Sequence, residues 1–233
     1  CSYYKNRSID NELSELRRVM YAEDRDWIHK FTKKGKVLDV GCSDGNFLDF
    51  FDEKLWDRHG IDLTSDALTI AKEKGVVTHQ GKIWETDVGD GYDLVMMRGV
   101  IEHFRDPIVA LKKCSEILKP GGILFITATP AGNSFAFNVY RHKWRLFTPY
   151  EHIHFFTVDL LSKVLNDMNM ELLARHYQYE ETPYANYEND FNKIIRDIEK
   201  IKLEGGLNNV ELSAPFPGSM LTAAWTKNTE IEY

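Results

Sequence analysis

Residues 37–45 read Val-Leu-Asp-Val-Gly-Cys-Ser-Asp-Gly, and this stretch decides the fold. Its first four residues are mostly apolar and β-branched, which predicts a short buried strand. The strand runs into Gly41 and Gly45, and glycines allow a tight turn whose backbone can approach a ligand closely. Residues 46–51 then begin a helical pattern. A strand, a glycine turn and a helix in this order form a nucleotide-sized crevice at the carboxyl end of the strand.

Two acids accompany this crevice. Asp39 lies inside the predicted strand, and Asp62 lies at the tip of a second predicted strand that ends at residues 60–64. Their separation, 62 − 39 = 23 residues, suits a crossover helix followed by a second strand. A carboxylate at Asp62 can accept both ribose hydroxyls of an adenosine, an interaction worth about 1.5–3 kcal/mol. Taken alone, Asp62 fits a helix cap or a solvated turn equally well, but the nearby glycine turn favours the ribose.

A third stretch, residues 92–127, has the pattern strand, helix, strand. The apolar run at 92–97 predicts a strand, residues 108–118 predict a helix that Lys-Pro-Gly-Gly ends, and residues 123–127 predict a buried strand. The order YDLV, IEHFRDP and LKPGGILFI resembles the fourth to sixth motifs of class I S-adenosylmethionine-dependent methyltransferases. The glycine turn resembles their first motif, so the resemblance covers roughly residues 35–130.

The resemblance implies an α/β, Rossmann-like, doubly wound sheet of seven strands, mostly parallel, with the last strand antiparallel. It also implies S-adenosylmethionine as cofactor, S-adenosylhomocysteine as product, an N-terminal helical lid and an insertion after the fifth strand. We expect a single domain over residues 1–233. Its expected parts are a lid (1–34), a cofactor-binding core (35–131), an acceptor-side insertion (132–157) and the C-terminal part of the core (158–233).

Nine residues are expected at the cofactor: Asp39, Gly41, Cys42, Gly45, Asp62, Leu63, Ile83, Trp84 and Arg98. Cys42 is expected there as a small residue and not as a nucleophile. Relatives often have Gly-Asp and an apolar residue after the third strand, whereas residues 81–85 read Gly-Lys-Ile-Trp-Glu. Ile83 or Trp84 is therefore expected to pack on the purine, and the acid facing the adenine is either Glu85 or absent.

Composition narrows the function classes. The 233 residues suffice for one large domain, and 29 basic against 36 acidic residues give a net charge of −7. Nucleic-acid binders normally carry a basic surface, so we expect no nucleic-acid partner. Three scattered cysteines without a C-x-x-C pair argue against disulfides and a zinc site. The apolar runs are too short to span a bilayer and no signal peptide is visible, so we expect a cytoplasmic protein without a membrane span.

Outside the motifs, periodicity predicts helices at residues 10–31, 158–168 and 187–202 and strands at 171–179 and 221–226. The first helix is the expected lid, with Tyr3, Tyr4 and Tyr21 either lining the cofactor or simply half-buried. The long connection at 180–217 either forms a homodimer interface or covers the acceptor.

The candidate general base is a histidine, whose ordinary pKa of about 6.5 suits proton transfer near neutral pH. Residues 151–156, Glu-His-Ile-His-Phe-Phe, resemble a stretch in a methyltransferase subfamily that modifies small molecules, quinones and polysaccharides. By that resemblance His152 is the expected catalytic residue and His103 the second candidate. Both also fit an ordinary structural role. We expect no metal site, because Glu102 and His103 alone are too few ligands.

The insertion is rich in aromatic and basic residues, and its expected acceptor-binding residues are Arg141, Trp144, Arg145 and His154. Aromatic rings stack on sugar faces and arginines hold phosphates. We therefore expect O-methylation of a small polar acceptor such as a sugar or surface-glycan precursor, in polysaccharide biosynthesis. The alternatives are N-methylation of an amino sugar or other small amine and, in a different class, a non-catalytic S-adenosylmethionine-binding protein. The glycine spacing disfavours a nicotinamide oxidoreductase.

Overall fold

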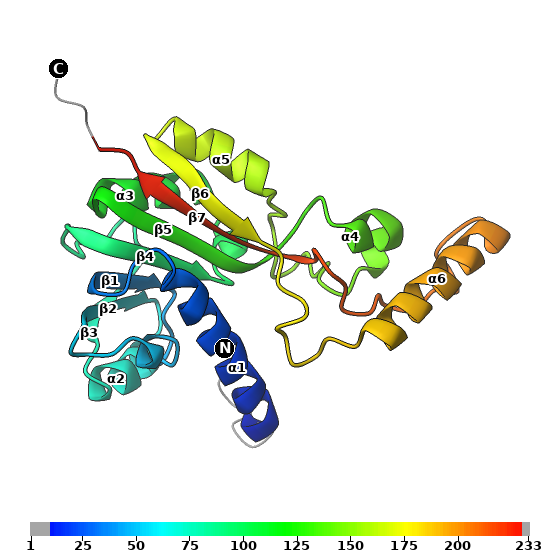
Figure 1. Ribbon diagram of the computed structural model, residues 1–233, viewed down its shortest axis with the longest axis horizontal. Helices are drawn as coiled ribbons and strands as arrows, with labels where there is room; N and C mark the ends of the chain where they lie inside the picture. The colour runs from blue at the N-terminus through cyan, green and yellow to red at the C-terminus, as the bar shows by residue number, and fades with distance from the viewer. Residues whose placement is uncertain (1–9, 230–233) are drawn as a thin grey trace.

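The computed structural model describes residues 10–229 and contains the predicted seven-stranded sheet (Figure 1). Neighbouring strands pair in parallel except at β7, which is antiparallel to both β5 and β6. In sheet order the strands are β3(Val77–Gln80), β2(Trp56–Asp62), β1(Gly35–Val40), β4(Tyr92–Arg98), β5(Leu118–Pro130), β7(Met220–Lys227) and β6(Met170–His176). The predicted fold class is confirmed, and the order reverses between β1 and β4, where open α/β sheets bind ligands.

The main helices lie within a few residues of their predicted positions, and local capping explains where they begin. Thr157 accepts a hydrogen bond from the amide of Leu160, and Asn186 from that of Asn189, as N-cap residues do. The helices are α1(Asp10–Ile28), α2(Ser65–Glu73), α3(Pro107–Ile117), α4(Phe135–Tyr140), α5(Val158–Asn166) and α6(Tyr187–Glu204), with short 3-10 turns η1(Leu48–Phe50), η2(Ile101–His103) and η3(Arg141–Lys143).

The crossover helix expected after the glycine turn is wrong. Residues 46–55 form only the turn η1, because Phe47, Leu48 and Phe51 are buried in a compact cluster. Helix α1 packs on that cluster, with the rings of Tyr21 and Phe47 centred 5.2 Å apart. The predicted lid helix therefore covers the segment where a crossover helix was expected (Figure 1).

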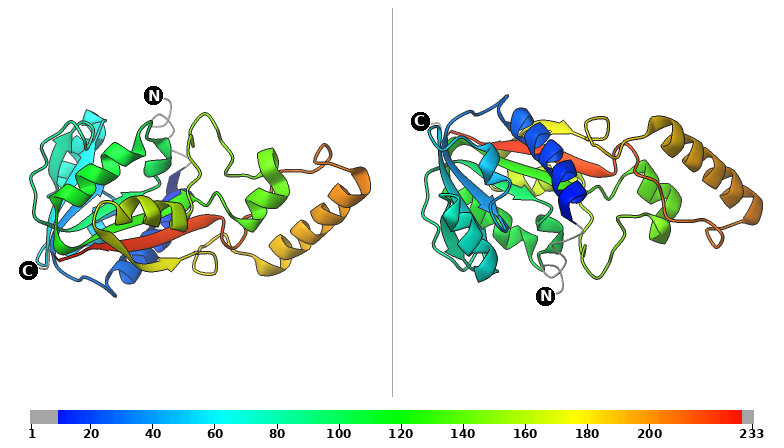
Figure 2. Two further views of the ribbon diagram at one scale, coloured as in Figure 1. Left: turned by 90° about the horizontal axis from the view of Figure 1, so that it is seen from above. Right: turned by 90° about the horizontal axis from the view of Figure 1, so that it is seen from below.

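Two apolar layers enclose the sheet (Figure 2). One lies beneath α3 and α5 and includes Val95, Leu111 and Leu161, all buried. The other lies beneath α1, η1 and α2 and includes Ile28, Phe51 and Phe125. Buried residues of β1 and β4 belong to both layers, so close packing positions the carboxyl ends of these strands. Among residues 10–229, no helix is long and apolar enough to cross a membrane. Tyr3 and Tyr4, proposed for the lid, lie outside the described residues.

A separate projection extends beyond the sheet (Figures 1 and 2). We call it the arm and define it as α4, η3, α6 and the residues that connect α6 to β7. Its small core joins the insertion to the connection at 180–217, because Tyr140 and Trp144 pack in one buried cluster with Ile194 and Val210. The connection therefore stabilises the insertion; the homodimer stays a prediction.

Candidate functional site

The glycine turn and Asp62 form the donor side of the site. Gly41 has φ +79°, and a Cβ there would lie 2.6 Å from a methyl group of Val100, so only glycine fits. One Asp62 carboxylate oxygen accepts a hydrogen bond from the amide of Ser43 at 3.0 Å. The other accepts from the amide of Thr64 at 2.9 Å. Asp62 therefore joins the end of β2 to the glycine turn, and its contact with a ribose stays a prediction.

Two further predicted donor residues are buried beside this turn. Burial raises the pKa of Asp39 to about 7, and the positive charge of Arg98 lowers it by less. The Cys42 thiol is also buried, which raises its pKa and agrees with a packing role. A Cβ on Gly60 would lie 2.5 Å from the Cys42 sulfur, so the neighbouring strand must be glycine at that position.

The residues expected around the adenine differ in exposure. Leu63 follows Asp62 directly and leaves 65% of its side chain exposed, so its apolar surface is free to contact a purine. Trp84 is partly buried against Phe104, with ring centroids 5.4 Å apart. Ile83 is fully packed in the core beneath the sheet. Of the two residues predicted to pack on the purine, Trp84 is therefore the more accessible.

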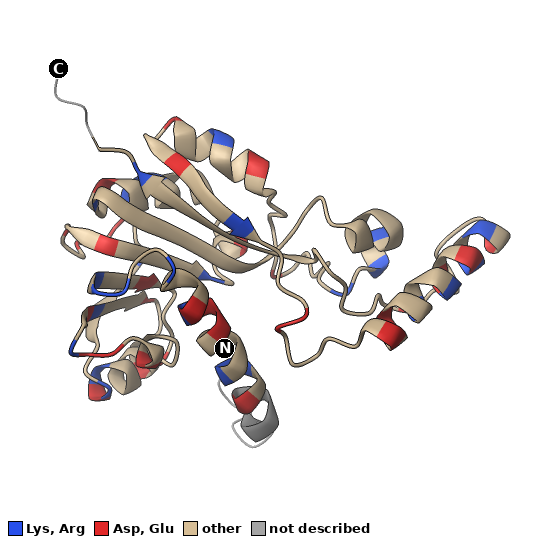
Figure 3. Ribbon diagram, in the orientation of Figure 1, with Lys and Arg blue, Asp and Glu red and all other residues tan. Residues whose placement is uncertain are grey.

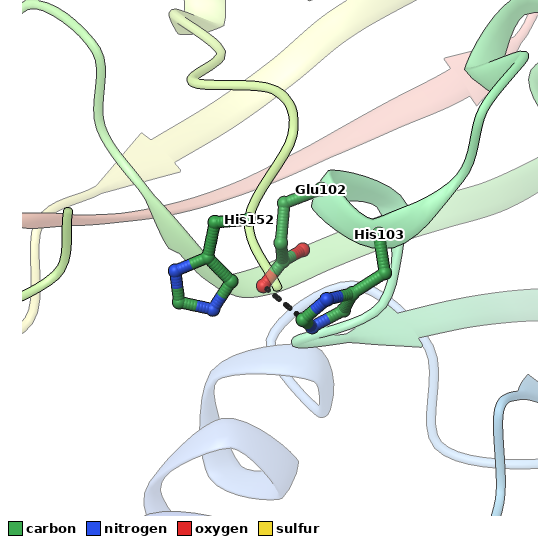
Figure 4. A group of neighbouring side chains, drawn as sticks. All are labelled: Glu102, His103 and His152. Atoms are coloured by element: carbon green, nitrogen blue, oxygen red, sulfur yellow. Dashed lines mark ion pairs between the residues drawn. The ribbon is translucent and has the colours of Figure 1, made fainter. Parts of the chain in front are cut away.

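Three side chains meet just past the end of β4 (Figure 4). Glu102 and His103 lie in η2, and His152 lies in the loop that returns from the insertion. The two imidazole centroids are 5.0 Å apart, and His103 Nε2 lies 3.9 Å from a Glu102 carboxylate oxygen. The predicted catalytic residue and its second candidate are thus brought together by the fold.

The backbone of Glu102 holds the returning loop in place. Its carbonyl oxygen accepts hydrogen bonds from the amides of Ile153 at 3.0 Å and His154 at 3.2 Å. Further along, the amide of Gly132 donates to the carbonyl of Phe156 at 2.8 Å. These bonds explain why a residue fifty positions away in the sequence reaches the end of β4.

Hydrogen bonds also decide the tautomer of both histidines. His103 Nδ1 lies 2.7 Å from the carbonyl oxygen of Glu151. His152 Nδ1 lies 3.0 Å from the carbonyl oxygen of Leu146 and 3.0 Å from the hydroxyl of Thr148. A carbonyl oxygen can only accept, so each Nδ1 carries the hydrogen and each neutral ring keeps its lone pair on Nε2. Both rings therefore have a basic nitrogen on the side away from the backbone.

Glu102 completes this group as a buried acid, with only 1% of its surface exposed. Burial raises its pKa to about 7. The hydroxyl of Thr129 donates to the carboxylate at 3.1 Å, and this bond and the charge of His152 favour the ionised form by a smaller amount. Near neutral pH the Glu102 carboxyl can therefore either hold or release a proton.

The same three residues bear on the expectation of no metal. Their ligand atoms all lie within 4.8 Å of one another. The argument from too few ligands considered only Glu102 and His103, and the fold adds His152 as a third. Absence of a metal consequently stays a prediction, and the chain offers one buried carboxylate and two imidazoles to any cation there.

The residues predicted to bind the acceptor differ in burial. Trp144 is 1% exposed and packs between Phe137 and Phe155, so its ring is a core residue of the arm and the predicted stacking on an acceptor is wrong. Arg141 and Arg145 are exposed, and among the described residues neither forms an ion pair with a carboxylate. Figure 3 shows basic residues on the arm near α4 and both basic and acidic residues along α6.

His154 and Arg98 complete the predicted set. The Nε2 atom of His154 is buried without a hydrogen-bond partner among residues 10–229. It is therefore a polar atom whose hydrogen-bonding capacity is unused within the described chain. Arg98, the last residue of β4, forms an ion pair with Asp24 of α1, with 2.8 Å between Nε and the carboxylate oxygen. Its guanidinium also lies 4.6 Å from the centre of the Tyr21 ring.

Sequence reasoning missed Asp24, although a signal was present. Asp24 lies on the apolar stripe of the first helix, between Met20 and Ile28, where an acid must be paired if it is buried. It also treated Glu102 only as a metal ligand. Its burial depends on β5 and the returning loop, which no local pattern shows.

Comparison with known proteins now identifies the family. A family model described as a methyltransferase domain matches residues 14–175, well over half of the chain. This chain belongs to the class I S-adenosylmethionine-dependent methyltransferases. The resemblance inferred from the motifs is confirmed, as are the fold and the cofactor class.

Curated relatives match over part of their length. A ubiquinone biosynthesis O-methyltransferase of Haemophilus ducreyi is 32% identical over 104 residues, which are 40% of this chain and 44% of that protein. One of a Bradyrhizobium species is 30% identical over 161 residues, which are 64% of this chain and 63% of that protein. The chain thus matches about half of the length of these relatives.

Solved structures share the fold at low identity. A SAM-dependent methyltransferase from Archaeoglobus fulgidus superposes with a TM-score of 0.60 at 20% identity, covering 91% of this chain and 94% of that one. The plantazolicin methyltransferase BpumL, solved with S-adenosylhomocysteine, superposes with a TM-score of 0.60 at 16% identity, covering 98% and 93%. At such identities the likeness concerns the fold.

Proposed function

We propose that this protein transfers the methyl group of S-adenosylmethionine to a hydroxyl oxygen of a small molecule, with His152 as general base. One observation carries this proposal. The Leu146 carbonyl fixes the proton of His152 on Nδ1, so the Nε2 lone pair lies in the group formed with Glu102 and His103. A hydroxyl is a weak nucleophile until its proton begins to leave, so a positioned base is useful for this acceptor.

The cofactor supplies an already activated methyl group, so the chain's own residues mainly align the acceptor and exclude water. Asp62 would hold the ribose hydroxyls, and the glycine turn would face the methionine end of the cofactor. His152 would remove the hydroxyl proton at Nε2, and the neighbouring Glu102 carboxyl would stabilise the resulting imidazolium. His103 presents a second basic nitrogen in the same group and would orient the acceptor.

The acceptor is best described as a hydroxylated small molecule. The curated relatives named above are called O-methyltransferases, which supports oxygen over nitrogen. The sugar acceptor was expected chiefly from aromatic stacking in the insertion, and the burial of Trp144 removes that ring. A glycan precursor therefore has less support than a phenolic hydroxyl, and both belong in the test.

The proposal is tested by incubating the protein with methyl-labelled S-adenosylmethionine and three acceptor sets: catechols, sugar nucleotides and primary amines. We expect label on oxygen of a hydroxylated acceptor and a loss of turnover in His152→Ala. Labelled product that forms only on amines, with unchanged turnover in His152→Ala, would contradict both the acceptor chemistry and the base.

A further inference from the structure

Helix α6 of the arm exposes large apolar side chains that the rest of residues 10–229 leaves partly uncovered. Phe191 is 39% exposed and Ile195 is 53% exposed. The ring of Phe191 contacts that of Phe216 at 4.8 Å between centroids, and Phe216 lies 5.6 Å from the exposed Phe135 of α4. We call these four residues the arm patch. An apolar patch of this kind on a protein surface usually marks an interaction site.

Two opposite charges lie on the same face of α6, one toward each end. Glu188 precedes Ile195 by 195 − 188 = 7 residues, and Lys202 follows it by 202 − 195 = 7. Seven residues are about two helical turns, or about 10 Å along the axis, so all three side chains lie on nearly the same side of the helix. Glu188 and Lys202 are exposed, and among residues 10–229 neither forms an ion pair, since those of α6 involve Lys193.

This spacing makes the face complementary to itself. If a second α6 packs antiparallel to the first about a two-fold axis at Ile195, Glu188 of one copy lies opposite Lys202 of the other. The symmetry produces this ion pair twice, as in an interface between identical surfaces. A lipid surface suits the face less well, because Glu188 and the exposed Glu199 would meet the negative potential of its headgroups.

We propose that two copies of this chain associate through antiparallel packing of α6, with Ile195 at the two-fold axis and a Glu188–Lys202 ion pair at each end. The contact would also cover Phe191 and its neighbours in the arm patch. Figures 1 and 2 show α6 at the far end of the arm, away from the sheet, so a second copy can reach it. The inference goes beyond the proposed function and does not depend on it.

The first test is sedimentation of the wild-type protein and Ile195→Lys over micromolar concentrations. We expect a wild-type dimer and a dimer Kd raised at least about a hundredfold in Ile195→Lys, because the substitution brings two lysines together at the axis. Ile195 is already half exposed, so the variant should fold, which circular dichroism checks. Glu73→Lys, at an exposed residue of α2 outside the arm, is the control and should dimerise normally.

A charge exchange tests the antiparallel register. Glu188→Lys and Lys202→Glu should each raise the dimer Kd about tenfold, because each places like charges opposite one another at both ends of the contact. The double variant restores opposite charges and should return the dimer Kd to within about threefold of the wild type. Loss of fold in a single variant would not be rescued in this way, so the rescue distinguishes a contact from a folding defect.

A wild-type protein that stays monomeric throughout would overturn the proposal. So would an unchanged dimer Kd in Ile195→Lys, which would place the contact elsewhere, and a double variant no better than its parents, which would exclude this register. A monomer that sediments with phosphatidylglycerol vesicles would assign the arm patch to a lipid surface instead. The affinity for S-adenosylhomocysteine should be equal in wild type and Ile195→Lys, so a failure of the dimer is distinguishable from a failure of the proposed function.

Discussion

The donor side and the acceptor side of this site are built in different ways. On the donor side, the parts lie within short segments, and Asp62 contacts the amides of Ser43 and Thr64 directly. On the acceptor side, Glu102 and His152 come from distant segments, and the loop reaches η2 through hydrogen bonds to the Glu102 carbonyl. Local backbone geometry defines the donor side, whereas tertiary packing assembles the acceptor side.

Because the two sides are built differently, we expect substitutions to affect donor binding and acceptor binding separately. Each contains one buried acid with a raised pKa, Asp39 on the donor side and Glu102 on the acceptor side. Substitutions on one side should change one ligand's parameters and leave those of the other unchanged, because the arm has its own small core.

The largest effect is expected for His152→Ala. Loss of a general base should lower kcat by about 10²–10⁴. The Kd for S-adenosylhomocysteine should not change, because His152 lies on the acceptor side. Steady-state kinetics and calorimetry measure the two quantities, with the exposed His142→Ala of the same insertion as control. A matching loss of donor affinity would show that the two sides are not separate.

Glu102→Gln should change how stability depends on pH. Burial raises the pKa of Glu102 to about 7 in the folded protein, above its ordinary value of 4.5. The folded state therefore loses stability as pH rises from the unfolded value through about 7, by up to about 3 kcal/mol. The variant should not show this loss, so it should gain stability relative to wild type at pH 8 compared with pH 5. Urea unfolding at both pH values tests this, and a constant difference would contradict the raised pKa.

Asp62→Ala tests the donor side at an intermediate magnitude. A charge-assisted hydrogen bond to the ribose contributes about 1.5 kcal/mol or more, so its loss should raise the Kd for S-adenosylhomocysteine at least tenfold. The acceptor KM should change less than twofold. Asp66→Ala, an exposed acid at the start of α2, is the control. Unchanged affinity in Asp62→Ala would leave Asp62 with only its backbone hydrogen bonds.

A smaller effect is expected when Arg141 and Arg145 are both replaced by Ala. Both side chains are exposed on the arm, where water and salt weaken their attraction for an anionic acceptor to less than about 1 kcal/mol. The acceptor KM should therefore rise about three- to fivefold. The donor Kd should stay constant. A joint change in both constants would mean that the arm also supports donor binding.

The smallest effect is expected on removal of metal. Burial raises the pKa of Glu102, so a cation at neutral pH would have to displace a proton from this carboxyl, which weakens its binding. Treatment with EDTA should therefore change kcat less than twofold. A loss of activity that Mg²⁺ or Zn²⁺ restores would assign Glu102, His103 and His152 to a cation site.

Much of the donor side could be predicted because its signals are local. Gly41 predicted a tight turn, and the structure has a positive φ at this residue. Asp62 was predicted at the end of a strand, and β2 ends there. The prediction of a crossover helix was wrong because the spacing of the apolar residues 47, 48 and 51 fits a buried turn as well as a helix. The prediction that Trp144 contacts the acceptor was wrong for a related reason. An aromatic residue in an insertion can be either a ligand contact or a core residue, and Trp144 is a core residue.

The sequence by itself therefore determined the approximate positions of most strands, the family resemblance and the donor turn, since strand periodicity and glycine geometry act over a few residues. Only the tertiary structure decided that His152 faces Glu102, that Asp24 pairs with Arg98 and that Trp144 is buried. Each of these depends on which distant segments pack together. Burial and pairing of polar groups are set by that packing, and no spacing along the chain specifies them.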